Sequence, residues 1–304
     1  MTQARARRFV TLDVFTTEAL KGNPLAVVLE CDGLDDARMQ AIAAEFNLSE
    51  TVFLAPPADP HARARMRIFT PEAELPFAGH PTVGTAVLLA LDEQQSRGFS
   101  GPQIFALEQA AGTVTCYAEP TGDGQGRARF HAPALPRIIH AAADAFAAAE
   151  ALGLEARDIG FGVHAPSAWG VAKGFAMAPV GSVETLSRIV PSARAIRAIT
   201  PADHAAIFAY ARVDEGLTFR ARMFAPGLGI VEDPATGSAV ASFAGALMQF
   251  EPLGDGVHDV VVLQGVEMGR ASRIEMQMTI QSGRLVGVEI GGAAVVVSEG
   301  TLRL

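Results

Sequence analysis

Cysteine is scarce in this sequence, with two residues among 304. Cys31 and Cys116 lie far apart and lack the spacing of metal ligands, so we expect two small buried apolar side chains and no disulfide framework. Basic residues are in the minority, 24 against 33 acidic ones, and the net charge of −9 argues against an extended nucleic-acid backbone as a partner. A local positive pocket could still hold a small anion.

Apolar runs clean enough to span a bilayer are absent, and no secretory signal opens the chain. Arg5, Arg7 and Arg8 directly precede an alternating apolar segment at 9–15, and we interpret them as a solvated tail before the first strand. The content of 49% hydrophobic and 19% charged residues is typical of compact domains. We therefore expect a cytoplasmic protein that binds neither nucleic acid nor membrane.

Strand and helix periodicities are mixed along the chain and predict an α+β fold. Expected helices cover 35–46 and 141–151. Expected strands cover 9–15, 25–30, 50–54, 65–70, 103–107, 113–117, 169–175, 206–211, 218–224 and 260–264, with β-rich sequence to the end. The run at 120–126 is interpreted as a turn or a short linker. The sequence thus predicts an N-terminal domain at 1–122, a C-terminal domain at 127–291, and a last strand at 292–304 that can return to the first domain.

An internal repeat links the two halves. Residues 67–71 read R-I-F-T-P and are followed by P-T-V-G-T-A at 81–86, while residues 222–226 read R-M-F-A-P and are followed by P-A-T-G-S-A at 234–239. This shared order predicts a single duplication rather than a solenoid array. We therefore expect two similar, pseudo-symmetric domains that face each other.

Each repeat ends in a helix-forming segment with no polar face, PTVGTAVLLAL or PATGSAVASFAGALM. Such a helix must be surrounded by protein, so we predict strands wrapped around a central helix in both domains. Proline is expected near the first helical position, where free N–H groups and the helix dipole attract an anion. Gly79, Gly84 and Gly237 would let a ligand approach the backbone there. Core helices with capped ends are the alternative.

Two ionisable residues occupy corresponding places before these helices. His80 and Asp233 each directly precede the proline of their repeat. Taken alone, His80 is typical of a capping or internally satisfied histidine, and Asp233 is typical of an N-cap. Their duplicated positions together favour a functional site.

Glu50 is a third candidate, because an expected strand at 50–54 places it on one face with Val52 and Leu54. A carboxylate on an apolar face has a raised proton affinity, which suits a general acid or base. A solvated edge-strand glutamate is the alternative, although Glu45 and Glu74 fit that role better.

Several segments together resemble the PhzF family, the phenazine-biosynthesis-type isomerases with the fold of diaminopimelate epimerase. The matching segments are LDVFTTEALKGNPLAVVL, EFNLSETVFL, RIFTPEAELPFAGHPTVGTA, RMFAPGLGIVEDPATGSA and LQGVEMGR, and the final GGAAVVVSEGTLRL also fits. The resemblance implies an active site between two pseudo-symmetric domains, a homodimer, and neither a metal nor an organic cofactor.

The resemblance also implies roles for individual residues. The catalytic glutamate of the N-L-S-E motif falls on Glu50, with Ser49 as a substrate contact. The family's histidine and aspartate fall on His80 and Asp233, and Ser238 lies close to the bound carboxylate. Ala271 stands where the family often has proline, a change that leaves these assignments in place.

Related epimerases place a cysteine ahead of each central helix as a thiol acid–base pair. The corresponding residues here are Ala78 and Ala235. Neither Cys31 nor Cys116 can replace them by position, which argues against two-thiol racemisation.

These observations predict a cofactor-independent isomerase of a small carboxylate. Glu50 would remove a proton from an activated carbon and return it elsewhere on the same skeleton, while His80 and Asp233 fix polar groups or relay protons. Two alternatives stay open: an epimerase or racemase of an amino-acid-like substrate, and a non-catalytic carboxylate-binding protein. A nucleophilic hydrolase is disfavoured, since no serine or cysteine nucleophile motif accompanies His80.

Overall fold

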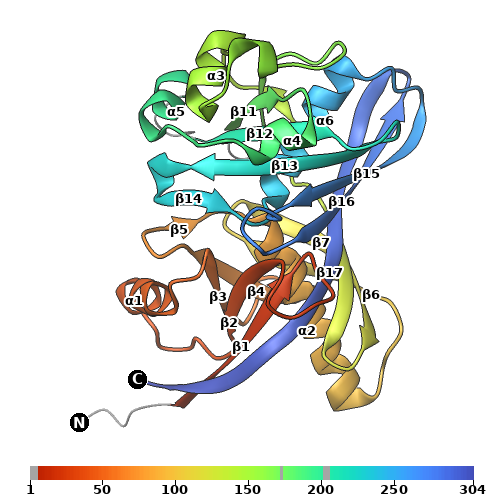
Figure 1. Ribbon diagram of the computed structural model, residues 1–304. Helices are drawn as coiled ribbons and strands as arrows, with labels where there is room; N and C mark the ends of the chain where they lie inside the picture. Colours follow the sequence, from red (N-terminus) through yellow and green to blue (C-terminus); the bar gives the residue numbers. More distant parts are fainter. Residues whose placement is uncertain (1–5, 172–173, 201–205) are drawn as a thin grey trace. The chain divides into compact units, whose positions relative to one another are not determined.

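The computed structural model describes residues 6–171, 174–200 and 206–304, and the chain divides into two compact units (Figure 1). The first unit comprises the residues up to Pro133 together with Gly291–Leu304, and the second comprises Ala134–Ile290. Both units combine strands with helices, which confirms the predicted α+β class.

The first unit is a curled sheet around one long helix. Its helices are α1 (Asp36–Phe46) and α2 (Gly79–Arg97). Its strands are β1 (Ala6–Val14), β2 (Asn23–Val28), β3 (Glu50–Ala55), β4 (Ala62–Phe69), β5 (Glu74–Leu75), β6 (Gln103–Gln109), β7 (Gly112–Gly122), β8 (Gln125–His131) and the later part of β17 (Arg284–Arg303).

The strand pairings of this unit close on themselves. β1 pairs with β2 and with β17, and the pairing continues through β3, β4, β6, β7 and β8 back to β17. Helix α2 contacts β1, β2, β3, β7 and β8. Strands therefore surround a central helix, as its apolar sequence predicted.

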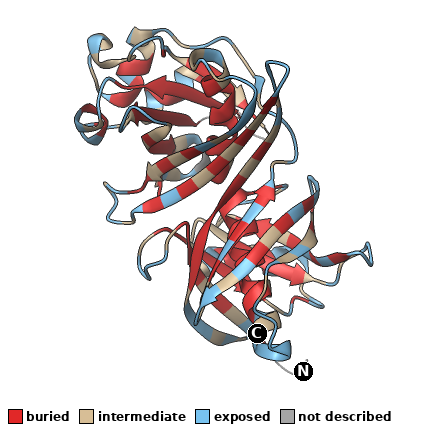
Figure 2. Ribbon diagram, turned by 90° about the vertical axis from the view of Figure 1, so that its right-hand side faces the viewer, coloured by how far each residue is buried: buried red, intermediate tan, exposed pale blue. Residues whose placement is uncertain are grey.

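Burial along α2 follows this arrangement. The ten residues from Gly79 to Leu88 are all buried, whereas the last two turns are polar and end at Gly98, whose φ of 71° closes the helix. Figure 2 shows buried residues concentrated in the central helices and in the strands. Because each large apolar side chain so buried contributes about 1.5–3 kcal/mol, the packing of α2 is a main source of stability in this unit.

The second unit likewise has strands packed on a central helix, α6 (Gly237–Phe250). Its other helices are α3 (Ala145–Leu152), α4 (Val183–Ser187) and α5 (Ala193–Ile199), with short 3₁₀ turns at Ala156–Asp158 and Pro226–Leu228. Its strands are β9 (Arg137–Ile138), β10 (Ser167–Gly170), β11 (Gly174–Pro179), β12 (Ile207–Arg212), β13 (Thr218–Ala225), β14 (Ile230–Asp233), β15 (Gly256–Gln264), β16 (Ser272–Gln281) and the first part of β17.

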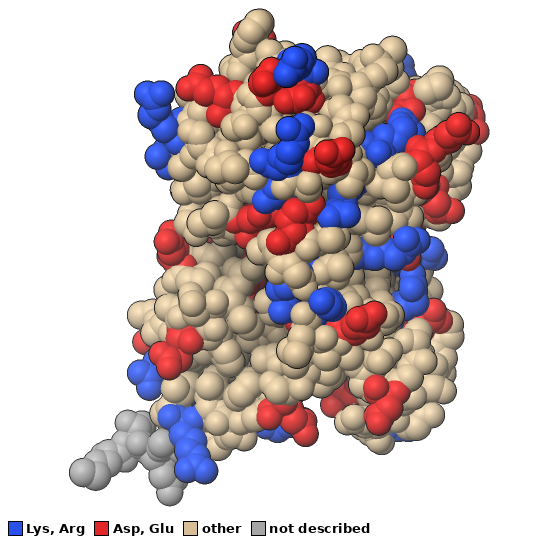
Figure 3. Space-filling model, in the orientation of Figure 1, with Lys and Arg blue, Asp and Glu red and all other residues tan. Residues whose placement is uncertain are grey.

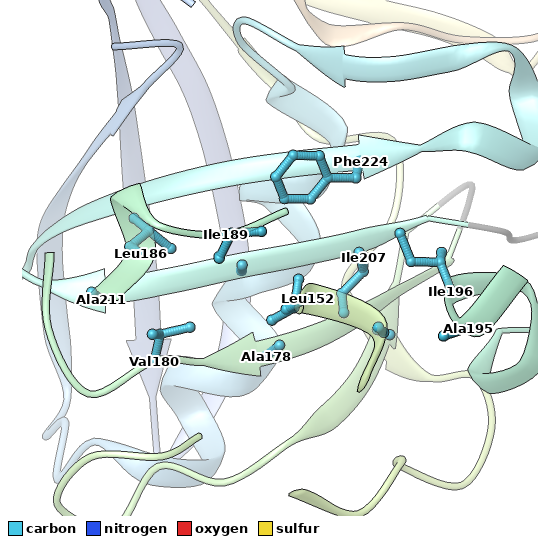
Figure 4. Packing of buried hydrophobic residues seen from close by; sticks show 13 residues of the cluster. Leu152, Ala178, Val180, Leu186, Ile189, Ala195, Ile196, Ile207, Ala211 and Phe224 are labelled. Carbon is cyan, nitrogen blue, oxygen red and sulfur yellow. The ribbon is translucent and has the colours of Figure 1, made fainter. Parts of the chain in front are cut away.

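Strand β12 is buried on both faces, which explains its continuous apolar sequence. On one face, Phe208 and Tyr210 contact Phe243 of α6, with ring centroids 5.7 and 4.6 Å apart. On the other face, Ile207 and Ala209 join an apolar cluster to which α3, α4 and α5 contribute (Figure 4). The central helix and the three shorter helices therefore cover opposite sides of this strand.

The order of elements that follows the repeat is the same in both units. β4, β5, α2, β6 and β7 correspond to β13, β14, α6, β15 and β16. In each set the first strand pairs antiparallel with the short strand and parallel with the strand after the helix, which in turn pairs antiparallel with the last strand. The structure therefore supports the duplication that the repeat predicted.

The division between the units differs from the expected linker. Residues 122–127 include the turn of the hairpin formed by β7 and β8, and β8 also packs on α2. These contacts keep β8 in the first unit, so the division follows Pro133. At the other end of the chain, β17 pairs with β1 from Val14 to Ala6, which places the last strand in the first unit.

The interpretation of the N-terminal arginines as a solvated tail is wrong for Arg7. This side chain is buried on β1 and donates hydrogen bonds to the carbonyl oxygens of Glu30 and Asp32, at 2.6 and 2.8 Å. Arg8 is exposed, and Arg5 lies outside the described residues. The bonds of Arg7 fix the chain after β2, which accounts for its burial.

The protein surface carries charges of both signs. Acidic and basic side chains are interspersed over the face shown in Figure 3. Exposed ion pairs of this kind each contribute about 0–1 kcal/mol, so they add little to the free energy of folding. No helix among the described residues is long and apolar enough to cross a membrane.

Candidate active site

The first unit brings two of the predicted site residues into contact. Glu50 is the first residue of β3 and His80 is the second residue of α2. Glu50 Oε2 lies 3.4 Å from His80 Nε2, and the two side chains are 12% and 4% exposed. Strand β3 thus delivers a carboxylate to the first turn of the central helix.

Burial keeps the imidazole of His80 neutral. Removal from water lowers its pKa to about 3, and a hydrogen bond with the Pro24 carbonyl only partly opposes this shift. On the side away from Glu50, Nδ1 lies 3.3 Å from Nδ2 of Asn23, which is fully buried. At neutral pH the ring therefore fixes its neighbours without placing a positive charge beside Glu50.

The start of α2 is suited to an anion. Its N-cap is Ala78, which has no side-chain acceptor, and no acidic residue lies in the first turn. The positive end of the helix dipole is therefore not offset by residues of the helix itself. Ser49 is half-buried beside Glu50, and Gly79 is the first residue of the helix.

The second unit holds the other predicted site residues at the start of α6. Asp233 ends β14, Gly237 begins the helix, and half-buried Ser238 follows it. The N-cap is Thr236 rather than Asp233. Asp233 is buried, and its Oδ2 accepts a hydrogen bond of 2.5 Å from the Thr236 hydroxyl.

The proline expected near the first helical position lies inside one central helix and before the other. Pro81 is the third residue of α2, whereas Pro234 lies before α6. In the second unit, the side chain of Gln264 forms hydrogen bonds with the Asp233 carbonyl oxygen and the Thr236 N–H, so the helix begins only after Thr236. His80 is therefore helical and Asp233 is not, although the repeat aligns them.

Gly84 was predicted to let a ligand approach the backbone, but its position in the structure is explained by packing. It is the sixth residue of α2, and a Cβ atom there would lie 2.6 Å from Leu25 Cδ2 and 2.7 Å from Val14 Cγ2. The glycine thus lets the helix approach β1 and β2 closely. We do not include it among the proposed substrate contacts.

Of the other glutamates considered from the sequence, neither is placed like Glu50. Glu45 is exposed on α1. Glu74 is exposed and forms an ion pair with Arg67, with two contacts of 2.7 Å.

That ion pair has a counterpart in the second unit. Arg222 of β13 binds Glu232 of β14 through two contacts of 2.8 Å. In both units the guanidinium also lies over the ring of the phenylalanine two positions later, about 5 Å from its centroid. The R-x-F motif therefore ties the strand to the segment that leads into the central helix.

Sequence reasoning gave no role to three buried residues of these sites. All three lie in family-like segments, and Gln264 also ends the strand expected at 260–264, but no function was assigned to them. Gln264 is fully buried and contacts the segment from Asp233 to Thr236. A glutamine directly after the apolar run at 260–263 is the signal that could have identified Gln264.

Both cysteines are buried and free, as the sequence predicted. Burial raises the pKa of the Cys116 thiol to about 12, and burial followed by the charge of Asp32 raises that of Cys31. Neither thiol is therefore ionised at neutral pH. Within the described part of the chain, no group of three or more His, Cys, Asp or Glu side chains is placed to hold a metal ion.

The fold and these residues define a class: a two-unit α+β protein in which a carboxylate–imidazole pair, rather than a thiol, stands at the start of a buried central helix. The sequence model of the phenazine biosynthesis-like proteins, PhzC-PhzF, matches residues 12–300. The chain therefore belongs to the PhzF family, which is a family of isomerases.

Individual relatives agree with this assignment. The chain is 46% identical over 304 residues to an uncharacterized isomerase of Mesorhizobium japonicum, covering 98% of this chain and 99% of the relative. It is 36% identical over 293 residues to trans-2,3-dihydro-3-hydroxyanthranilate isomerase of Pseudomonas aeruginosa, covering 96% and 98%. A crystal structure of a PhzF-family phenazine biosynthesis protein of Bacillus anthracis superimposes with a TM-score of 0.85 at 25% identity, covering 99% and 100%.

Proposed function

We propose that this isomerase transfers protons on a small carboxylate without a cofactor, and that Glu50 is its general acid and base. The observation that carries the proposal is the 3.4 Å contact between Glu50 Oε2 and Nε2 of a buried, neutral His80. A neutral imidazole adds no positive charge that would weaken a neighbouring base. Positioned proton transfer of this kind contributes about 10²–10⁴-fold to a rate.

The substrate class is proposed from the start of α2 and from the relatives. A carboxylate bound at the uncapped helix terminus would sit beside Glu50. The Pseudomonas aeruginosa relative is named for trans-2,3-dihydro-3-hydroxyanthranilate, a cyclic amino carboxylate. A compound of that type is therefore the first substrate to test.

The remaining predicted residues have proposed roles around this reaction. His80 orients the Glu50 carboxylate, while Ser49 and Gly79 contact the substrate. In the second unit, Asp233 exchanges or relays protons, and Gly237 and Ser238 bind substrate polar groups.

The test compares the rearrangement rate of trans-2,3-dihydro-3-hydroxyanthranilate by wild type, Glu50→Gln and the matched control Glu45→Gln. Glu45 is exposed on α1, a few residues before Glu50. We expect Glu50→Gln to lower kcat by about 10²-fold or more and Glu45→Gln to leave it unchanged. An active Glu50→Gln variant contradicts the proposal. Scrambled configuration in place of rearrangement would favour an epimerase, and binding without turnover would favour a carboxylate-binding protein.

A further inference from the structure

A buried glutamine organises the segment that carries Asp233. Gln264 is the last residue of β15 and is fully buried. Its Oε1 accepts a hydrogen bond of 3.1 Å from the Thr236 backbone N–H, and its Nε2 donates to the Asp233 carbonyl oxygen at 2.7 Å. One side chain thus holds both ends of the turn between β14 and α6.

The same amide also sets the direction of the Thr236 hydroxyl. Gln264 Nε2 donates a second hydrogen bond, of 3.1 Å, to Thr236 Oγ1. Because this oxygen accepts from the amide, its own proton is directed to Asp233 Oδ2, 2.5 Å away. A hydrogen bond to a carboxylate is stronger than one between neutral groups, so this contact fixes the rotamer of Asp233.

The first unit also contains a glutamine–threonine pair, but its threonine lies one position earlier in the repeat, since Thr82 aligns with Ala235, and its end point differs. Gln109, the last residue of β6, donates from Nε2 to Thr82 Oγ1 at 2.9 Å, and the Thr82 hydroxyl donates to the Ala78 carbonyl oxygen at 2.7 Å. There the chain of donors ends on the helix backbone. In the second unit it ends on a carboxylate, which points to a role beyond closing the helix terminus.

The residue after Gln264 holds the same turn from the other side. Gly265 has a φ of +72°, and a Cβ atom there would lie 2.6 Å from the Pro234 carbonyl oxygen and 2.5 Å from that of Arg270. Only glycine fits both the conformation and the space. The Gln-Gly pair is therefore built against the turn that carries Asp233.

We propose that Gln264 and Thr236 are positioning residues for Asp233. Gln264 orients the Thr236 hydroxyl, and this hydroxyl fixes the Asp233 carboxylate so that it can exchange or relay protons with the substrate. This inference rests on the proposed role of Asp233. It adds two residues to the reaction that themselves make no contact with the reacting atoms.

The first test is independent of turnover and uses ¹³C-aspartate-labelled protein, with the Asp233 carboxylate resonance assigned by its loss in Asp233→Asn. We expect Thr236→Val to shift this resonance, Thr236→Ser to restore it, and Thr200→Val to leave it unchanged. Thr200 is the matched control, because its hydroxyl is also buried and donates to a backbone carbonyl oxygen, that of Ile196. An unshifted resonance in a folded Thr236→Val overturns the inference. Should that variant not fold, Gln264→Leu gives the same comparison.

The second test is kinetic, with trans-2,3-dihydro-3-hydroxyanthranilate as the probe. We expect Thr236→Val to lower kcat about 10-fold or more with little change in KM, as one charge-assisted hydrogen bond is lost, and Thr236→Ser to recover it. In the Asp233→Asn background the same substitution has no further effect. An equal loss in both backgrounds shows a structural role and overturns the inference. An impaired Asp233→Asn beside an unaffected Thr236→Val overturns it while keeping the proposed function, whereas a fully active Asp233→Asn removes the proposed role of Asp233 itself.

Discussion

Lowering the pH perturbs His80 in a way that the structure specifies. An unfolded chain protonates this histidine near its ordinary pKa of about 6.5, whereas burial lowers the pKa in the folded protein to about 3. Between these two values the unfolded state binds more protons than the folded state. The stability that His80 retains at neutral pH is therefore complete above pH 6.5 and is lost progressively as the pH falls.

The magnitude follows from the linkage relation. Each pH unit inside this window costs about 1.4 kcal/mol for one such group, so a fall from pH 6.5 to 5 costs about 2 kcal/mol. His164 acts in the same direction, because burial and the charge of Arg212 lower its pKa to about 4. The variant His80→Asn keeps the His164 contribution and removes that of His80.

The assay is urea denaturation of wild type and His80→Asn from pH 7.5 to 5. We expect the free energy of unfolding of the wild type to fall by about 2 kcal/mol more than that of the variant. In parallel, NMR of ¹³C-labelled imidazole follows the protonation of His80 directly. A titration midpoint near pH 6.5, or equal losses of stability in both proteins, would refute the reasoning that burial keeps this ring neutral.

Three further predictions concern packing, ion pairing and thiol reactivity. Gly245→Ala places a methyl group 2.2 Å from Trp169 Cε3, so we expect a loss of about 1–3 kcal/mol by denaturation, against no change for Gly254→Ala, where nothing lies within 4 Å. Arg222→Met leaves the Glu232 carboxylate, which is 13% exposed, without its ion-pair partner, and calorimetry should show a loss of about 3–5 kcal/mol; a change below 1 kcal/mol contradicts the assigned pairing. Cys116 should resist a thiol-specific reagent in native protein at pH 8 and react in urea, since burial raises its pKa to about 12.

The arrangement of strands around two central helices was predictable because it depends on local sequence patterns. A helix without a polar face requires protein on all sides, and the two copies of the R-x-F-x-P repeat fixed which helices were equivalent. The structure adds the reason for the motif itself. Arg67 and Arg222 each bind a carboxylate on the next short strand, so the repeated arginine is a structural tie rather than a surface charge.

Features that depend on distant partners were not predictable. The run at 120–126 has the composition of a linker, yet β7 and β8 on either side of its turn pair with each other, and β8 also pairs with the C-terminal strand β17. Arg7 has the sequence context of a tail, but carbonyl groups more than twenty positions away bind it. Local composition carries no information about such acceptors.

The residues of the candidate site likewise fall into those that the sequence could identify and those that it could not. Chemistry and the duplicated positions identified His80 and Asp233, and family resemblance selected Glu50 over Glu45. The buried amides that hold them, Asn23 and Gln264, have partners 57 and 28 or more residues away. Their importance became visible only when the strands and helices were brought together.

Solvent deuterium incorporation measures proton transfer by Glu50 most directly. Wild type and Glu50→Gln are each incubated in D₂O with trans-2,3-dihydro-3-hydroxyanthranilate and related small carboxylates, and ¹H NMR locates any deuterium in the recovered compound. We predict that the wild type introduces deuterium at the carbon that gains a proton on rearrangement and that Glu50→Gln introduces none. Undiminished incorporation by Glu50→Gln would contradict the assignment of the base, and binding with neither incorporation nor rearrangement by either protein would contradict proton-transfer catalysis altogether.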